Sequence, residues 1–158
     1  MKQIKWRTWL FWILLAEGAG ALAGWLTADG VKQFTQTAIQ PSFAPPAVIF
    51  PIVWGILYGL MGSGAARVAL SDGGKNRERA LGIFLLQLIV NFFWSLFFFN
   101  LGAYGFSFLW ILLLWVLILG TILLFRRVDP VAALLQIPYL LWVTFAAVLT
   151  YAIWMLNG

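Results

Sequence analysis

The sequence contains no cysteine and no histidine. These absences exclude disulfides, thiolate nucleophiles and Ser-His-Asp triads, and they argue against zinc sites and the common haem ligations. Acidic residues are also scarce, because the chain has only five: Glu17, Asp29, Asp72, Glu78 and Asp129. An enzyme built on paired carboxylates would have to find its pair among them. We therefore expect neither a metal site nor a resident cofactor.

Charged residues of both signs are rare for a chain of this size. They make up 9% of the 158 residues, against about 25% in an ordinary soluble domain. Apolar residues make up 63%, aromatic residues 18%, and ten residues are tryptophan; the mean hydropathy is +0.95. A soluble domain could not bury this much apolar surface, so the composition indicates an integral membrane protein.

Five apolar runs are each long enough to cross a bilayer as a helix, since about 20 residues span a hydrocarbon core of about 30 Å. They are residues 6–27, 46–68, 80–100, 104–125 and 131–156. A polar loop over residues 28–45 and a tight turn around Gly102 separate two pairs of them. Pro130 can open the last helix, and Pro138 can kink it. The sequence predicts a single domain over residues 1–158, an all-α bundle of five transmembrane helices.

The basic residues predict how the chain is oriented. With five spans, nine of them fall on one side of the membrane: Lys2, Lys5, Arg7, Arg67, Lys75, Arg77, Arg79, Arg126 and Arg127. Only Lys32 falls on the other side. The positive-inside rule then predicts a cytoplasmic N-terminus and an external C-terminus, in what we expect to be a bacterial cell membrane. The net charge of +5 reflects this asymmetry, and no basic stripe suggests a nucleic-acid partner.

Polar side chains inside the predicted spans are candidate binding groups. Gln87, Asn91 and Trp94 share one helical face at i, i+4 and i+7. Because amides in hydrocarbon need partners, this face should point inward, either as interhelical contacts or as the polar rim of a cavity. Glu17 is either a ligand or proton site, or a carboxyl group hydrogen-bonded to a neighbouring helix, since it costs about 2.5–3.5 kcal/mol at the bilayer centre.

Several aromatic residues lie well inside the predicted spans. The three interior tryptophans are Trp54, Trp94 and Trp142. With Tyr58 and Tyr139 they could line a pocket for a large planar ligand, although aromatic packing explains any one of them taken alone. Trp142 and Ala146 lie one turn apart, and a small residue beside a flat one makes a slot.

Small residues recur at helical spacing in the first two spans. Gly20 and Gly24 form one G-x-x-x-G pair, and Gly55 and Gly59 form another. Such pairs let helix backbones approach closely in lipid. They predict either packing within the bundle or a homodimer.

Four segments together resemble the TspO/MBR family of tryptophan-rich sensory and translocator proteins, also called peripheral-type benzodiazepine receptors. They are PSFAPP at 41–46, VWGILYGLMG at 53–62, Q-x-x-x-N-x-x-W at 87–94 and AALLQIPYLLW at 132–142. The first loop departs from the family pattern, because Phe43 replaces a common tryptophan and Gln40 a common lysine. The basic residue of the proposed cholesterol motif is also missing, so we do not expect sterol transport.

The resemblance implies a five-helix bundle, usually a homodimer, that binds porphyrins and benzodiazepine- or isoquinoline-type ligands. By likeness, the pocket-lining positions are Trp54, Asn91, Trp94, Trp142 and Ala146. The loop that lids the pocket contains Pro41, Pro45 and Pro46. We therefore expect a membrane receptor or carrier for porphyrin-type tetrapyrroles, acting in tetrapyrrole regulation, transport or stress.

Two alternatives remain open at the level of sequence. The first is an enzyme that degrades porphyrin with light and oxygen, for which Trp54 and Trp142 are the candidate residues. The second is a structural protein that assembles partners through its small-residue helix faces.

Overall fold

A computed structural model describes residues 2–158, with side chains from Lys5 onward. Its helices are α1 (Lys2–Leu26), α2 (Ala28–Thr37), α3 (Ile49–Ala69), α4 (Gly74–Ser95), the π-helical turn η1 (Leu96–Asn100), α5 (Tyr104–Val128), α6 (Pro130–Leu135) and α7 (Ile137–Asn157). The described part of the chain contains no strand. The predicted all-α fold is confirmed.

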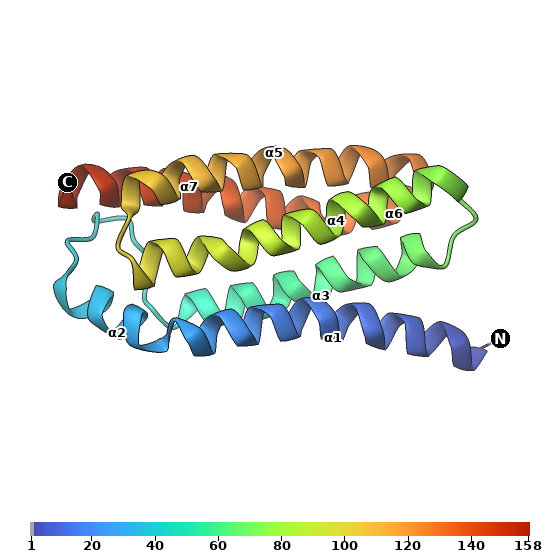
Figure 1. Cartoon of the computed structure of the whole chain (residues 1–158), viewed down its shortest axis with the longest axis horizontal. Helices are drawn as coiled ribbons and strands as arrows, with labels where there is room; N and C mark the ends of the chain where they lie inside the picture. Colours follow the sequence, from blue (N-terminus) through green and yellow to red (C-terminus); the bar gives the residue numbers. More distant parts are fainter. Residues whose placement is uncertain (1) are drawn as a thin grey trace.

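Five helical stretches are long and apolar enough to cross a membrane. They are Lys5–Leu26, Ile49–Ala69, Gly74–Asn100, Tyr104–Val128 and Pro130–Asn157. In the bundle, α1 packs along α3, α4 packs along α5, and α5 packs along α7 (Figure 1). The two termini lie at opposite ends of the bundle, as an odd number of crossings requires.

The boundaries differ from the prediction at three places. Residues 28–45, expected as a loop, contain the whole of α2. The third span was expected from residue 80 but its helix begins at Gly74, because the polar residues after Gly74 continue the helix beyond its apolar part. The last span is interrupted at Gln136, two residues before Pro138. Pro138 has no N–H to donate to the preceding turn, so the helical ladder is weakened before the proline.

The helix α2 is held against the turn between α4 and α5. Phe34 places its ring 5.2 Å from Phe98 and 6.2 Å from Tyr104, measured between ring centroids. Gly30 is buried, and a Cβ at this position would meet the backbone carbonyl of Phe99 at 2.7 Å. The packing of α2 could not be predicted from its composition, which is mostly polar. A helix of 10 residues needs only a narrow apolar face to pack against its neighbours.

Two predicted chain reversals are confirmed. Gly102 has a positive φ of +61°, which a glycine adopts without steric cost, and α5 begins two residues later. Pro130 opens α6, and the preceding Asp129 side chain accepts a hydrogen bond from the backbone N–H of Val131 at 3.0 Å. Asp129 also pairs with Arg67 of α3 at 3.0 Å, which ties two helices together at this end of the bundle.

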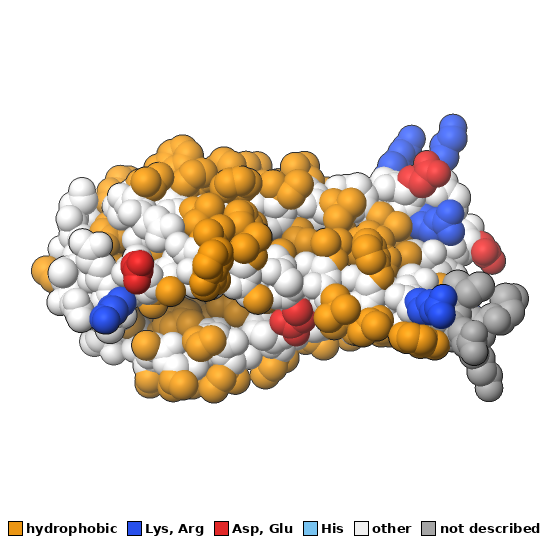
Figure 2. All heavy atoms as spheres, turned by 60° about the horizontal axis from the view of Figure 1, so that its bottom comes forward, with side chains coloured by type: hydrophobic (Ala, Val, Ile, Leu, Met, Phe, Trp, Pro, Cys, Tyr) orange, Lys and Arg blue, Asp and Glu red, His pale blue; other side chains and the backbone are white. Residues whose placement is uncertain are grey.

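On the face shown in Figure 2, hydrophobic side chains extend along the bundle and most charged side chains lie at its ends, whereas Glu17 lies within α1. Most Lys and Arg side chains lie at the end that contains the N-terminus. Lys32 belongs to α2, at the other end. The side chain of Lys2 lies outside the described residues. The basic residues that the sequence assigns to opposite sides of the membrane therefore lie at opposite ends of the folded bundle.

Candidate functional site

A chain of buried hydrogen bonds joins three helices in the middle of the bundle. The Tyr58 hydroxyl of α3 donates to Asn91 Oδ1 of α4 at 2.7 Å. Asn91 Nδ2 donates to the hydroxyl of Tyr139 on α7 at 2.7 Å, and this hydroxyl donates to Gln87 Oε1 at 2.6 Å. All four side chains are buried. The predicted inward face of Gln87 and Asn91 is confirmed.

Four aromatic side chains meet between α3 and α7, and two of them are the tyrosines of this chain of hydrogen bonds. Trp54 stacks on Tyr58 at a centroid distance of 5.5 Å. Its ring also approaches Tyr139 at 6.2 Å and Trp142 at 6.5 Å, in both cases edge to face. We call Trp54, Tyr58, Tyr139 and Trp142 the ring cluster. Because Trp54 contacts three other rings directly, a planar guest would replace some of these contacts.

The other two predicted pocket residues flank the ring cluster. Ala146 is buried one turn beyond Trp142 on α7. Trp94 stacks on Phe98 at 5.0 Å and packs in the neighbouring aromatic cluster, to which Phe145 also belongs. The structure thus brings Trp54 into contact with Tyr58, Tyr139 and Trp142, whereas the ring contacts of Trp94 are with Phe98 and Phe99.

Three buried hydrogen-bond donors near this site lack a partner among the described residues. They are Gln87 Nε2, Trp94 Nε1 and Trp142 Nε1. A buried donor without an acceptor costs about 1–3 kcal/mol, so an acceptor placed beside any of these groups would recover free energy. The region therefore combines aromatic faces with unpaired N–H groups, which suits a flat ligand that carries hydrogen-bond acceptors.

The loop between α2 and α3 lies at the same end of the bundle as the C-terminus (Figure 1). It contains the three predicted lid prolines, Pro41, Pro45 and Pro46. The carbonyl of Pro41 accepts a hydrogen bond from Ala44 N at 3.1 Å, and that of Pro46 accepts one from Ile49 N at 3.0 Å, where α3 begins. These prolines therefore shape two turns of the loop.

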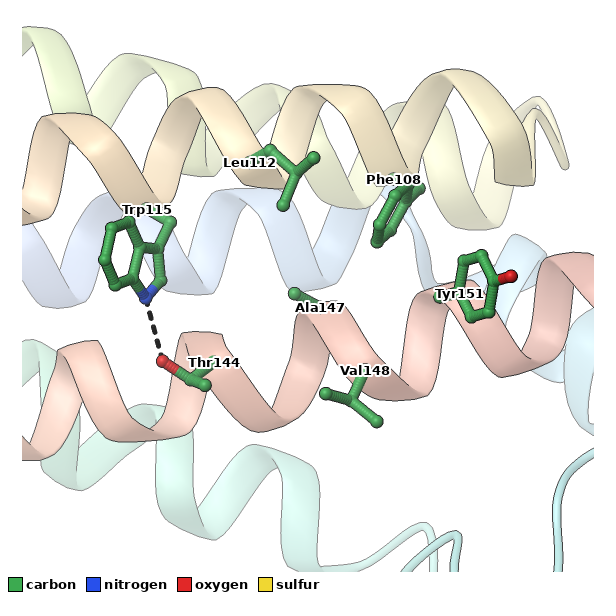
Figure 3. A pocket seen from close by; sticks show the side chains of 7 residues that line it. All are labelled: Phe108, Leu112, Trp115, Thr144, Ala147, Val148 and Tyr151. Atoms are coloured by element: carbon green, nitrogen blue, oxygen red, sulfur yellow. Dashed lines mark hydrogen bonds between the residues drawn. The ribbon is translucent and has the colours of Figure 1, made fainter.

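A groove of about 500 Å³ on the outer side of α5 and α7 was not predicted (Figure 3). Its lining includes Trp115, Thr144, Ala147 and Tyr151. The Trp115 indole N–H donates to Thr144 Oγ at 2.8 Å across the two helices. No sequence signal indicates this face, because almost every residue over 104–125 is apolar and periodicity does not separate one face of the helix from another.

The glycine pairs do not act as pairs. A Cβ on Gly20 would collide with the ring of Tyr58, so Gly20 packs inside the bundle. Nothing lies within 4 Å of a Cβ on Gly24 or Gly55. The backbones of α1 and α3 approach closely at Gly62, where a Cβ would lie 2.5 Å from Ile13 Cα. Gly20 is therefore not available for contact with a second protein, because the ring of Tyr58 covers it.

Glu17 lies near the middle of α1 and is half-buried beside α3. Its Oε2 is 3.5 Å from the position of a Cβ on Gly59, so that glycine leaves room for the carboxyl group. The described residues give Glu17 no hydrogen bond and no ion pair. Of the two alternatives for Glu17, the hydrogen bond to a neighbouring helix is not observed among the described residues, and the ligand or proton site stays a prediction.

Comparison with known proteins places these features in context. The model of the TspO/MBR family matches residues 12–155. The "Tryptophan-rich protein TspO" of Chlorobaculum tepidum is 38% identical over 150 residues, which cover 90% of this chain and 91% of that protein. The "Translocator protein" of Ovis aries is 37% identical over 147 residues, covering 90% and 86%. "Protein CrtK" of Rhodobacter capsulatus is 37% identical over 119 residues, covering 75% and 74%.

Proposed function

Because the chain belongs to the TspO/MBR family, we propose that it is a membrane receptor for porphyrin-type tetrapyrroles. It is an integral, multi-pass membrane protein. The observation that carries the proposal is the ring cluster, in which Trp54 contacts Tyr58, Tyr139 and Trp142. A porphyrin is large, flat and aromatic, so it can replace ring–ring contacts by stacking contacts of the same kind.

The polar groups beside the ring cluster give the ligand an orientation. The indole N–H of Trp142 and the amide Nε2 of Gln87 are buried donors without acceptors. Asn91 is already hydrogen-bonded to both Tyr58 and Tyr139. It therefore holds these two rings in place and does not itself bind the ligand. A ligand with acceptors at its edge is favoured over a pure hydrocarbon, because it pairs donors that otherwise stay unsatisfied.

The test is a titration of protoporphyrin into the purified protein in detergent, followed by tryptophan fluorescence quenching. Trp142→Ala removes one ring of the cluster, and we expect binding to weaken by about tenfold, since an aromatic pair is worth about 0.5–1.5 kcal/mol beyond its buried area. Trp25→Ala is the matched control, because Trp25 is 75% exposed on α1. Equal affinity in the wild type and in Trp142→Ala would remove Trp142 from the site.

The orientation and the assembly state extend the proposal. A cytoplasmic N-terminus is supported by the concentration of Lys and Arg at the end of the bundle that contains it (Figure 2). A homodimer is supported by Gly24 and Gly55, whose open surfaces on α1 and α3 would let a second helix approach closely.

A further inference from the structure

The last residue of α7 holds the loop between α2 and α3 by two hydrogen bonds. The backbone N–H of Ile39 donates to Asn157 Oδ1 at 2.9 Å. Asn157 Nδ2 donates to the carbonyl of the same residue, Ile39, at 2.8 Å. The side-chain amide therefore satisfies both backbone groups of one loop residue, as a neighbouring β-strand would.

Ile39 depends on these bonds more than on packing. It directly follows the C-cap of α2, Ala38, which has extended backbone angles of φ −80° and ψ 140°. The chain has left the helical ladder at this point, and Asn157 supplies partners for both polar groups of Ile39. The Ile39 side chain is 59% exposed. The amide of Asn157 thus connects the start of the loop to the end of α7.

From this point the loop runs along α7 toward the ring cluster. Beyond Ile39, Phe43 packs edge to face against Phe145, at a centroid distance of 6.4 Å. At the beginning of α3, Phe50 packs against Trp142 of the ring cluster at 5.7 Å. These three contacts follow α7 from its C-terminal residue toward the middle of the bundle. Of the three, the Asn157–Ile39 contact is made by hydrogen bonds and the other two by aromatic rings.

We propose that Asn157 latches this loop and thereby sets the rate at which a planar ligand leaves the ring cluster. The inference rests on the proposed function. Asn157 is a positioning residue, because it contacts Ile39 rather than the ring cluster and acts through the loop. Without these two hydrogen bonds, the loop is held by the apolar contacts of Phe43, Ala44 and Phe50, which a ligand leaving the ring cluster can displace more readily.

The experiment compares Asn157→Leu, which keeps the volume but cannot form either bond, with Asn157→Asp, which keeps the acceptor for Ile39 N–H. Leu156→Ala is the control, because Leu156 is an exposed neighbour in the same helix. Two readouts are needed: hydrogen exchange of residues 38–48 without ligand, and the dissociation rate of protoporphyrin by stopped-flow fluorescence. For Asn157→Leu we expect exchange and dissociation about tenfold faster, with association little changed. Asn157→Asp should be intermediate.

The outcomes separate the latch from the binding site. Unchanged exchange of residues 38–48 in Asn157→Leu overturns the latch. Faster exchange with unchanged porphyrin dissociation overturns the claim that Asn157 sets the rate at which the ligand leaves. A wild type that binds no porphyrin overturns the proposed function together with the exit step, while the exchange measurement still decides whether Asn157 holds the loop. Equal effects in Leu156→Ala would assign the change to the helix end in general and would also overturn the proposal.

Discussion

The hydrogen-bond chain through Asn91 leads to a quantitative prediction about stability. Tyr58→Phe removes one interhelical hydrogen bond but keeps the ring that stacks on Trp54. Such bonds in membrane proteins are worth about 0.6 kcal/mol on average and at most about 1.7 kcal/mol, so we expect a loss of about 1 kcal/mol in the free energy of unfolding. Asn91→Leu breaks two bonds and leaves the buried Tyr58 hydroxyl unpaired. We expect this variant to lose about 2 kcal/mol.

The double variant tests the reasoning. With Tyr58→Phe already present, Asn91→Leu no longer leaves an unpaired hydroxyl at Tyr58. The double variant should therefore lose about 2 kcal/mol rather than the sum of about 3 kcal/mol, a coupling of about 1 kcal/mol. The assay is equilibrium unfolding in mixed detergent–SDS micelles, followed by far-ultraviolet circular dichroism, with Phe93→Leu on the exposed face of α4 as control. Losses that add to within about 0.3–0.5 kcal/mol would refute the coupled chain.

Two further predictions concern α1 and its contact with α3. Gly62→Ala places a Cβ against the backbone of Ile13, so we expect a loss of about 1–3 kcal/mol by the same unfolding assay. Gly18→Ala, where a Cβ meets nothing within 4 Å, should stay within about 0.5 kcal/mol of the wild type, and equal losses in both would contradict the packing. Glu17→Leu should not lower the unfolding free energy in the same assay, because the described residues give this carboxyl group no hydrogen bond or ion pair that the substitution would remove. A lower stability of Glu17→Leu would show that the carboxyl group has a partner in the bilayer.

The spanning helices could be predicted because hydropathy and length alone define them. The inward face of Gln87 and Asn91 followed from the cost of an unpaired amide in hydrocarbon. Both predictions depend on how the side chains interact with the surrounding lipid, and neither depends on which helices are neighbours. The turn at Gly102 was predictable for a local reason, since a glycine between two long apolar runs marks a reversal.

The features that could not be predicted depend on which helices are neighbours. The spacing of Gly20 and Gly24 is that of a helix-pairing motif, but only the fold shows that Tyr58 covers Gly20. Trp115 could not be assigned to the outer groove, because its helix is apolar on every side. The hydrogen bonds between Ile39 and Asn157 join residues separated by 118 positions, and no local pattern indicates them.

The interruption at Gln136 divides the last span into two helices, α6 and α7, that make different contacts. The short α6 is anchored at its start by Asp129, which also pairs with Arg67, and Gln136 itself reaches the Met61 carbonyl at 3.4 Å. The rings of Tyr139 and Trp142 begin only beyond this joint, on α7. Tyr139 and Trp142 are therefore positioned by α7, whereas α6 ties the last span to α3 at the charged end of the bundle.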